Sequence, residues 1–383
     1  MGDHRLRTLQ LGNDWFDERP GGLNRMYQEL IRHLPSAGID VDGLVVGSEQ
    51  VDISTAGTVS AFAPANRPIY ERLIRVRKAA LRLIEAKNPD LLATHFALYA
   101  IPLVDRLRSF PTVVHFHGPW AVEAGVEGGS GFTSGVQAAI ERGVYSRGAR
   151  IIVLSQAFAH EVTHRYRVPE EIVRVVPGGI DSTRFNDELS RTEARERLGW
   201  PTDRPIVLSV RRQMRRMGLE NLVDAVQLVA ARVPEMLLML VGSGPITGEL
   251  KKRIEERGLS QNVRQLGRLP DADLPLAYRA ADMSVVPTQA LEGFGMITLE
   301  SLASGTPALV TPVGGLPEIL QLFSPECVFP GTTAEDIALV LGEALSGARC
   351  LPSGEECRRY AASQFSWPII AGRIANIYRE VLA

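Results

Sequence analysis

Residues 283–303 read MSVVPTQALEGFGMITLESLA, and this stretch contains the strongest structural signal in the chain. The apolar run Met283–Val286 predicts a buried strand, and the residues up to about Ala303 predict a helix. Between strand and helix, Gly293 and Gly295 allow the backbone to approach a ligand closely. The start of a helix also presents unpaired N–H groups and the positive end of the helix dipole. The stretch therefore predicts a phosphate-binding turn.

Two carboxylates flank this turn, Glu292 in the loop and Glu300 a turn or more into the helix. Because a carboxylate can accept two hydrogen bonds from a vicinal diol, the pair suits the ribose and the transferred sugar of a sugar nucleotide. Spacing alone leaves an alternative open, in which two solvated glutamates flank a glycine-softened loop. The candidate donor-binding residues of the stretch are Gly293, Phe294, Gly295, Met296, Ile297 and Glu300.

Short apolar runs alternate with helical stretches along all 383 residues. The predicted strands are Leu6–Leu11, Gly43–Val46, Thr58–Phe62, Asp90–Thr94, Thr112–Phe116, Arg150–Leu154, Val173–Val176, Ile206–Val210, Met236–Val241, Val263–Leu266, Met283–Val286, Pro307–Val310 and Cys327–Phe329. The predicted helices include Leu23–Leu34, Ile69–Ala86, Glu220–Arg232 and Leu274–Ala280. This alternation predicts an α/β protein in which helices cover both faces of parallel sheets.

The alternation pauses at Pro177–Asp181 and the polar stretch up to Pro205, which we expect to be a linker region. We predict two doubly wound Rossmann-like domains, residues 1–180 and 181–365, followed by a closing helix over residues 366–383. Two such domains facing one another would leave a cleft at the carboxyl ends of their strands, where open α/β sheets bind ligands.

The composition excludes several classes of protein. Hydrophobic residues make up 45% of the chain, as in an ordinary globular protein. The chain has 42 basic and 44 acidic residues, so we expect no nucleic-acid partner. No apolar run is long enough to span a bilayer, and the first 11 residues lack the layout of a signal peptide. We therefore expect a cytoplasmic protein.

No metal site is expected. Cys327, Cys350 and Cys357 fit neither a disulfide framework nor a zinc knuckle, which favours a reducing compartment. His115 and His117 form an H-x-H pair, but we expect their rings to point to opposite faces of the strand. No further ligand-type residues cluster near this pair in the sequence.

A second anion-binding signal is the loop 209–218, SVRRQMRRMG, which follows the predicted strand Ile206–Val210. Only four of the 42 basic residues are lysines, so any anion site in this chain is expected to be built from arginine. Four arginines leaving one buried strand would repel one another unless an anion lay among them, and guanidinium groups bind phosphate through paired hydrogen bonds. A solvated basic loop is the alternative.

Weaker signals lie at other strand ends. Gly21 and Gly22 form a turn before a helix, and His117 follows a strand, although a lone histidine is more often structural. The segment Gly242–Gly248 imitates a dinucleotide-binding fingerprint, but its third glycine comes one residue late and Pro245 removes a donor N–H. NAD binding is therefore disfavoured.

Together these motifs resemble the retaining glycosyltransferases of family 4, which have the two-domain GT-B architecture. The resemblance covers nearly the whole chain and is most specific in the Glu-x7-Glu motif, Glu292 to Glu300, with its internal Gly-Phe-Gly. The supporting motifs are Gly21/Gly22, His117, Pro177–Asp181, Arg212, Gly242–Pro245, Gly314–Glu318 and Phe365–Trp367. In the family the first domain lies on the acceptor side, and the closing helix crosses back to it.

The resemblance implies a role for each candidate residue. Arg212 and the N–H groups from Gly295 to Ile297 would hold the diphosphate, and Gly22 would let backbone approach it. Glu300 would bind the ribose, and Gly244 would lie near the base. The candidate catalytic residues are His117 and Glu292, which would contact the donor sugar, together with Arg212.

The chain departs from the family pattern at three places. Met217 stands where a lysine usually accompanies the loop arginine, and Arg215 or Arg216 is the expected substitute, because a buried diphosphate needs a second cation. Arg211 stands where the family has a glycine, and Gly178 where it has an asparagine.

The expected reaction is retaining transfer of a hexose from a nucleotide diphosphate sugar to a hydroxyl acceptor, without a metal or other cofactor. We expect UDP-glucose as the first donor and GDP-mannose as the second. The alternatives are a nucleotide-sugar epimerase of the same fold or a non-catalytic nucleotide-sugar-binding protein. The basic helix 69–86 could touch a membrane surface or an anionic acceptor, although a solvated face is the favoured interpretation.

Overall fold

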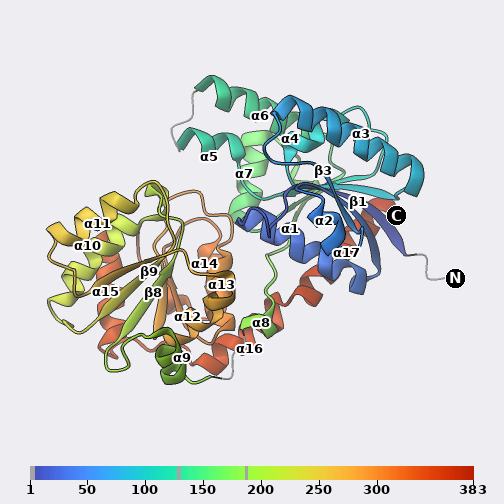
Figure 1. The fold of residues 1–383 in the computed structure, drawn as a ribbon. Coiled ribbons are helices and arrows are strands. Elements are labelled where there is room, and N and C mark those ends of the chain that lie inside the picture. Colours follow the sequence, from blue (N-terminus) through green and yellow to red (C-terminus); the bar gives the residue numbers. More distant parts are fainter. Residues whose placement is uncertain (1–4, 127–130, 186–188) are drawn as a thin grey trace. The chain divides into compact units, whose positions relative to one another are not determined.

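The computed structural model describes residues 5–126, 131–185 and 189–383, which form two compact units (Figure 1). Unit 1 comprises the chain up to Gly179 together with Trp367–Ala383, and unit 2 comprises Ile180–Ser366. Each unit is an α/β structure built around one parallel sheet, as the alternation of the sequence predicts.

Unit 1 contains a seven-stranded sheet of order β3-β2-β1-β4-β5-β6-β7, in which every strand pair is parallel. Its strands are β1 (Leu6–Asp14), β2 (Ile39–Val46), β3 (Val59–Ala63), β4 (Leu91–Thr94), β5 (Thr112–Phe116), β6 (Arg150–Val153) and β7 (Val173–Val175). The strand order reverses between β1 and β4, where Leu9 pairs with Leu92. Open α/β sheets bind ligands beyond the carboxyl ends of the strands at such a switch point.

The helices of unit 1 include the last helix of the chain. They are α1 (Gly22–His33), η1 (Leu34–Ala37), α2 (Gln50–Ser54), α3 (Ile69–Lys87), α4 (Ala97–Ala100), η2 (Ile101–Leu103), α5 (Trp120–Val126), α6 (Gly131–Tyr145), α7 (Gln156–Tyr166), η3 (Glu170–Ile172) and α17 (Trp367–Leu382). Helix α17, red in Figure 1, packs against α1 and η1 near the start of the chain.

Unit 2 contains a five-stranded parallel sheet of order β10-β9-β8-β11-β12, which reverses between β8 and β11. Its strands are β8 (Ile206–Val210), β9 (Leu237–Val241), β10 (Val263–Gly267), β11 (Met283–Val286) and β12 (Ala308–Val310). Its helices are α8 (Ser182–Phe185), α9 (Arg191–Leu198), η4 (Arg215–Met217), α10 (Leu219–Ala230), α11 (Thr247–Glu256), η5 (Asp271–Asp273), α12 (Leu274–Ala280), α13 (Met296–Ala303), α14 (Leu316–Leu320), η6 (Pro325–Cys327), α15 (Ala334–Leu345) and α16 (Gly354–Phe365).

Local sequence explains where these elements run. The central strands β9 and β11 are buried along their whole length, because helices cover both faces of the sheet. Ser190, Thr333 and Ser353 begin α9, α15 and α16 with capping boxes, in which the hydroxyl accepts from an N–H of the first turn.

Two sequence-based expectations were wrong. Cys327–Phe329 is not a strand, since the short helix η6 runs into it and only an isolated bridge joins Val310 to Val328. The stretch up to Pro205 is not all linker, because it contains α8 and α9, and α9 packs against α12. The other predicted strands are present, with their ends shifted by a few residues at most.

Across residues 5–126, 131–185 and 189–383, none of the helices combines the length and the apolar character that a membrane crossing requires.

The indole of Trp367 ties the last helix into unit 1, where it is 2% exposed and stacks on the His33 ring at 5.8 Å. We expect Trp367→Ala to lower the free energy of unfolding by about 3–5 kcal/mol, because the truncation leaves a cavity. The exposed Leu382 on the same helix is the control, and Leu382→Ala should stay within about 0.5 kcal/mol of the wild type. Urea denaturation followed by circular dichroism measures both, and equal losses would contradict this role of Trp367.

Candidate functional site

The predicted polar site residues of unit 2 lie in and just after the loops at the carboxyl ends of β8 and β11, the two adjacent strands at its switch point. Residues 211–218 follow β8, and residues 287–295 follow β11 and lead into α13. A third loop follows β9 and contacts the first at Gly244, where a Cβ would collide with the carbonyl oxygen of Gln213. Packing therefore accounts for a glycine at the predicted site residue Gly244, because any other residue would carry the colliding Cβ.

A buried ion pair joins the two central loops. Arg211 Nη2 lies 2.5 Å from Glu292 Oε2, and the two side chains are 8% and 14% exposed. The same guanidinium donates to the hydroxyl of Thr288, which in turn donates to Glu292 Oε2 at 3.3 Å. The candidate catalytic carboxylate thus has a cationic partner at the switch point. Sequence reasoning noted Arg211 only as a departure from glycine and missed this contact.

Some arginines of the 211–218 loop already have carboxylate partners within the protein. Arg215 lies 2.7 Å from Glu220 and 2.5 Å from Glu249, and Arg211 is paired with Glu292. The expectation that all four arginines would repel one another without a bound anion was wrong, because the protein's own carboxylates neutralise these two.

The remaining two arginines of the loop differ in their surroundings. The side chain of Arg212 is exposed and makes no hydrogen bond or ion pair within the described part of the chain. Arg216 is half-buried and donates to the carbonyl oxygen of Leu291 at 3.0 Å, which places it alongside the loop that follows β11. Met217, at the position of the expected lysine, is buried.

Helix α13 begins at the predicted glycine-rich turn. Gly295 precedes its first residue in the left-handed region, with φ of 86°, and a Cβ there would collide with the Leu316 side chain. Met296 and Ile297 are half-buried in the first turn, where N–H groups have no acceptor within the helix. Phe294 is 4% exposed and packs against the Phe365 ring at 6.0 Å, so its side chain belongs to the core. Gly293 is half-buried in the loop before it.

Glu300, in the second turn of α13, is 5% exposed. The hydroxyl of Tyr278 on α12 donates to its Oε2 at 3.0 Å. Tyr278 is itself buried and was not among the predicted site residues, since nothing in the spacing connects α12 to this motif. The tyrosine holds the carboxylate in one orientation.

Three histidines meet at the carboxyl edge of the unit 1 sheet. His95 follows β4, and its ring lies 4.2 Å from that of His115 and 5.4 Å from that of His117. The expectation that His115 and His117 point to opposite faces was wrong, because side chains two residues apart on a strand share a face. Burial lowers the pKa of His117 to about 4 and those of His95 and His115 well below the usual value.

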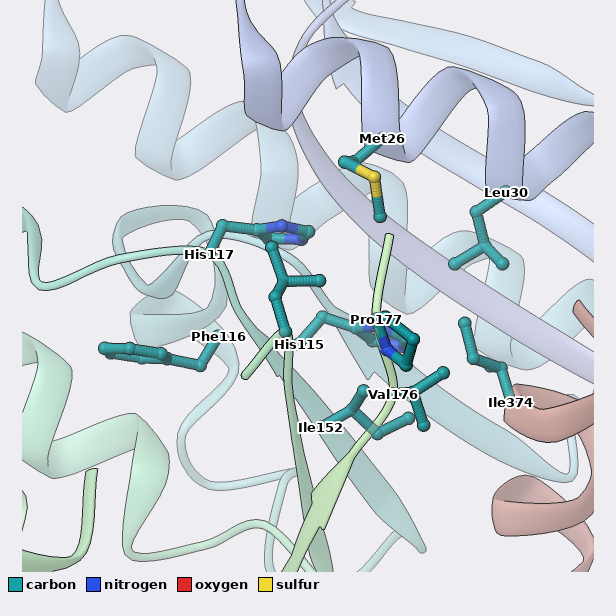
Figure 2. Close-up of a pocket in the computed structure, with 10 residues that line it drawn as sticks. Met26, Leu30, His115, Phe116, His117, Ile152, Val176, Pro177 and Ile374 are labelled. Atoms are coloured by element: carbon teal, nitrogen blue, oxygen red, sulfur yellow. The ribbon is translucent and has the colours of Figure 1, made fainter. Parts of the chain in front are cut away.

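A pocket of unit 1 lies against two of these rings (Figure 2). Helix α1 contributes Met26 and Leu30, and α17 contributes Ile374. The lining residues are Met26, Leu30, His115, Phe116, His117, Ile152, Leu154, Val176, Pro177 and Ile374. The pocket is therefore apolar apart from its two histidines.

A buried carboxylate anchors the chain just after His117. Glu141 is fully buried and accepts from the N–H groups of Trp120 and Ala121 at 2.8 and 3.3 Å, at the start of α5. The hydroxyls of Tyr166 and Tyr145 donate to the same carboxylate at 2.8 and 3.3 Å. Burial raises the pKa of Glu141. Sequence reasoning gave no signal for this anchor.

Two further predicted features lie in unit 1. Gly22 is the exposed first residue of α1, and a Cβ there would meet no other atom within 4 Å. On the basic helix α3, Arg77 pairs with Asp105 at 2.7 Å and Arg72 donates to Tyr99 at 2.7 Å. The other basic residues of α3 are exposed, and its contact with a membrane or an anionic acceptor stays a prediction.

Within the described ranges, no group of three or more His, Cys, Asp or Glu side chains is arranged to hold a metal ion.

Two family models match the chain. "Glycosyltransferase Family 4" matches residues 20–184 and "Glycosyl transferases group 1" matches residues 190–364, so together they span most of both units.

Curated relatives match over a little more than half of the chain. A GDP-mannose-dependent alpha-(1-6)-phosphatidylinositol monomannoside mannosyltransferase of Mycobacterium tuberculosis is 29% identical over 221 residues, 55% of this chain and 57% of the relative. A D-inositol 3-phosphate glycosyltransferase of Corynebacterium jeikeium is 32% identical over 241 residues, 60% of this chain and 57% of the relative. The matched segment thus spans little more than half the length of these relatives.

Solved structures share the fold over nearly the whole chain. The sucrose-phosphate synthase of Thermosynechococcus elongatus has a TM-score of 0.77 at 24% identity and covers 99% of both chains. The Anabaena protein HepE in complex with UDP and glucose has a TM-score of 0.79 at 19% identity, covering 98% of this chain and 100% of that one. At these identities the likeness establishes the GT-B fold of the chain and nothing further.

The buried neutral histidines predict acid sensitivity. Because the pKa of His117 falls from 6.5 to about 4 on folding, the unfolded chain binds more protons in that window and stability falls as the pH drops through it. Each such histidine contributes up to about 1.4 kcal/mol per pH unit. We expect His115→Phe to flatten the fall in the free energy of unfolding between pH 6.5 and 5, measured by urea denaturation.

His160 is the matched control, because it is exposed on α7. His160→Gln should keep the wild-type dependence on pH. A His115→Phe protein with an unchanged slope would contradict the assignment of the acid sensitivity to the three-histidine cluster.

Proposed function

Since the chain belongs to glycosyltransferase family 4, we propose that it transfers a hexose from a nucleotide diphosphate sugar to a hydroxyl group of an acceptor, with retention at the anomeric carbon. The observation that carries this proposal is the convergence at one sheet edge of an exposed arginine, a helix start and two oriented carboxylates. These are Arg212, α13, Glu292 and Glu300.

The diphosphate would bind to Arg212 and to the N–H groups of Met296 and Ile297. A guanidinium group offers a phosphate two parallel hydrogen bonds, and a helix start adds oriented amide dipoles. Such preorganised donors stabilise the charge that develops on a departing diphosphate, so the transfer is proposed to need no metal or other cofactor. Gly22 at the start of α1 is proposed to leave room for backbone to approach the same group.

Arg216 is proposed as the second cation in place of the missing lysine at Met217. Arg215 is less suited, because its side chain is exposed whereas that of Arg216 is half-buried. Arg216 lies against the loop 288–292 through the Leu291 carbonyl, next to the start of α13. The desolvation of a diphosphate would favour a cation that is itself half-buried.

The two carboxylates are proposed to bind hydroxyl groups at either end of the donor. The Tyr278 hydroxyl fixes one oxygen of Glu300, which is proposed to bind the ribose. Arg211 and Thr288 fix one oxygen of Glu292, which is proposed to bind the transferred sugar. His117 is the proposed contact to the donor sugar from unit 1, and Gly244 is proposed to lie near the base.

The donor is proposed to be GDP-mannose before UDP-glucose. The M. tuberculosis relative is GDP-mannose-dependent, whereas UDP appears with structures that share only the fold. The names of both curated relatives contain inositol, so inositol derivatives belong in the acceptor panel along with simple glycosides. A thermal-shift comparison of the two donors tests the order, because a ligand at 100 times its dissociation constant stabilises the folded state by about 2.7 kcal/mol.

Arg212 is the sharpest test of the diphosphate site. We expect Arg212→Ala to weaken binding of GDP or UDP by about 10- to 100-fold, the worth of a lost charge-assisted hydrogen bond, measured by calorimetry. In a transfer assay with the acceptor panel the same change should lower the rate by about 10²–10³-fold.

Arg215→Ala is the matched control, since it removes the same charge from the same loop but from a side chain that is held by two carboxylates. It should bind the nucleotide within about threefold of the wild type, because exposed ion pairs contribute little. Wild-type nucleotide affinity in Arg212→Ala would remove the diphosphate assignment.

A further inference from the structure

A chain of hydrogen bonds runs through unit 1 from the backbone of β2 to His117, and its direction is fixed at the first step. The hydroxyl of Thr8 donates to the carbonyl oxygen of Asp40 at 3.2 Å. With its one proton committed, the Thr8 oxygen can only accept, and Gln10 Nε2 lies 3.0 Å from it. The amide nitrogen of Gln10 therefore faces Thr8, and its oxygen faces the other way.

The second step sets the tautomer of His95. Gln10 Oε1 lies 3.1 Å from His95 Nε2, so this ring nitrogen carries the proton and donates. Burial lowers the pKa of His95 well below its usual value, and a neutral imidazole carries one N–H only. His95 Nδ1 therefore presents a lone pair.

The third step sets the tautomer of His117. Its Nε2 lies 3.1 Å from His95 Nδ1, and since that atom can only accept, Nε2 of His117 must donate. The other nitrogen, Nδ1, is left with a lone pair. Nδ1 is buried and has no hydrogen-bond partner in the described part of the structure. A buried acceptor without a partner costs about 1–3 kcal/mol, which a ligand that donates to it would recover.

We infer that this chain, Thr8–Gln10–His95–His117, presents His117 Nδ1 as a hydrogen-bond acceptor for a sugar hydroxyl, with His95 and Gln10 as positioning residues. The inference rests on the proposed function and deepens it. A lone pair attracts a hydroxyl proton and repels the oxygens of a phosphate, so the ligand group is an alcohol rather than the diphosphate. The hydroxyl comes from the donor sugar or from the acceptor.

A branch of the same network supplies an internal control. Tyr378 on α17 lies 2.7 Å from His115 Nε2 and 3.3 Å from Gln10 Nε2. Removing its hydroxyl disturbs the buried network while the Thr8 contact still orients Gln10. Tyr378→Phe should therefore leave the tautomer of His117 unchanged.

The direct test is nitrogen NMR of the full chain labelled with ¹⁵N-histidine, with His117 assigned by loss of its signals in His117→Gln. In the ligand-free wild type we expect a protonated Nε2 and an unprotonated Nδ1. His95→Phe keeps a ring to stack on His115 but removes the acceptor, so His117 should become a mixture of tautomers. Gln10→Met should have the same effect, because His95 then loses the partner that fixes its proton.

Binding measurements separate the two sources of the hydroxyl. GDP-mannose and UDP-glucose without an acceptor, and the acceptor panel without a donor, are each added to the labelled protein. If the hydroxyl belongs to the donor, the Nδ1 signal shifts with a donor alone, and His95→Phe raises the KM for the donor about tenfold with little change in kcat. If the hydroxyl belongs to the acceptor, the Nδ1 signal shifts with an acceptor alone, and His95→Phe raises the KM for the acceptor about tenfold with little change in kcat.

The outcomes distinguish this inference from the proposed function. A ligand-free wild type with a proton on His117 Nδ1 overturns the inference, whatever the protein binds. The inference is also overturned if His117 becomes a mixture of tautomers in Tyr378→Phe, as is expected for His95→Phe. A wild type that binds no nucleotide sugar overturns the proposed function alone, and the tautomer of His117 still decides the hydrogen-bond chain.

Discussion

Reversal of strand order in a parallel sheet is the constraint on which the rest of this structure depends. The loops that follow two adjacent strands at a reversal turn to opposite faces and leave room between them for a ligand. In unit 2 these strands are β8 and β11, and in unit 1 they are β1 and β4. Arg211 and Glu292 meet at the first reversal, and Gln10 and His95 meet at the second. Residues far apart in the sequence become partners because the sheets bring those strands together.

The two units stabilise the polar groups buried at their strand reversals in different ways. Unit 2 buries opposite charges as a pair, and removing one partner of such a pair costs far more than exchanging both for apolar groups. Unit 1 buries histidines that stay neutral, and it links His95 and His117 to the backbone of β2 through directed hydrogen bonds. Charged donors and amide dipoles suit a phosphate, whereas a neutral ring with a free lone pair suits an alcohol. The proposed division of chemistry between the units, with a phosphate at unit 2 and an alcohol at unit 1, follows from this difference.

Sequence reasoning was most successful where local pattern decides the structure. Apolar runs predicted the parallel strands, and the glycine-rich turn predicted the start of α13, since both depend on neighbours in sequence. The predicted strand Cys327–Phe329 was wrong because three apolar residues do not distinguish a strand from a short helix. The contacts of Arg211, His95 and Tyr278 could not be predicted, since each partner lies on another strand or helix. The error over His115 and His117 was of another kind, because the two-residue period of a strand already places them on one face.

The departure at Arg211 changes how the missing lysine at Met217 should be understood. A loop with four arginines suggests a surplus of positive charge, yet Arg211 and Arg215 are already neutralised by carboxylates of the protein. The candidate cations for a bound anion are the exposed Arg212 and the half-buried Arg216, together with the amide groups at the start of α13. A glycine at this position would leave Glu292 without this cationic partner. Arg211 therefore serves the carboxylate rather than the phosphate, and the loop divides its charges between the two ends of the proposed donor.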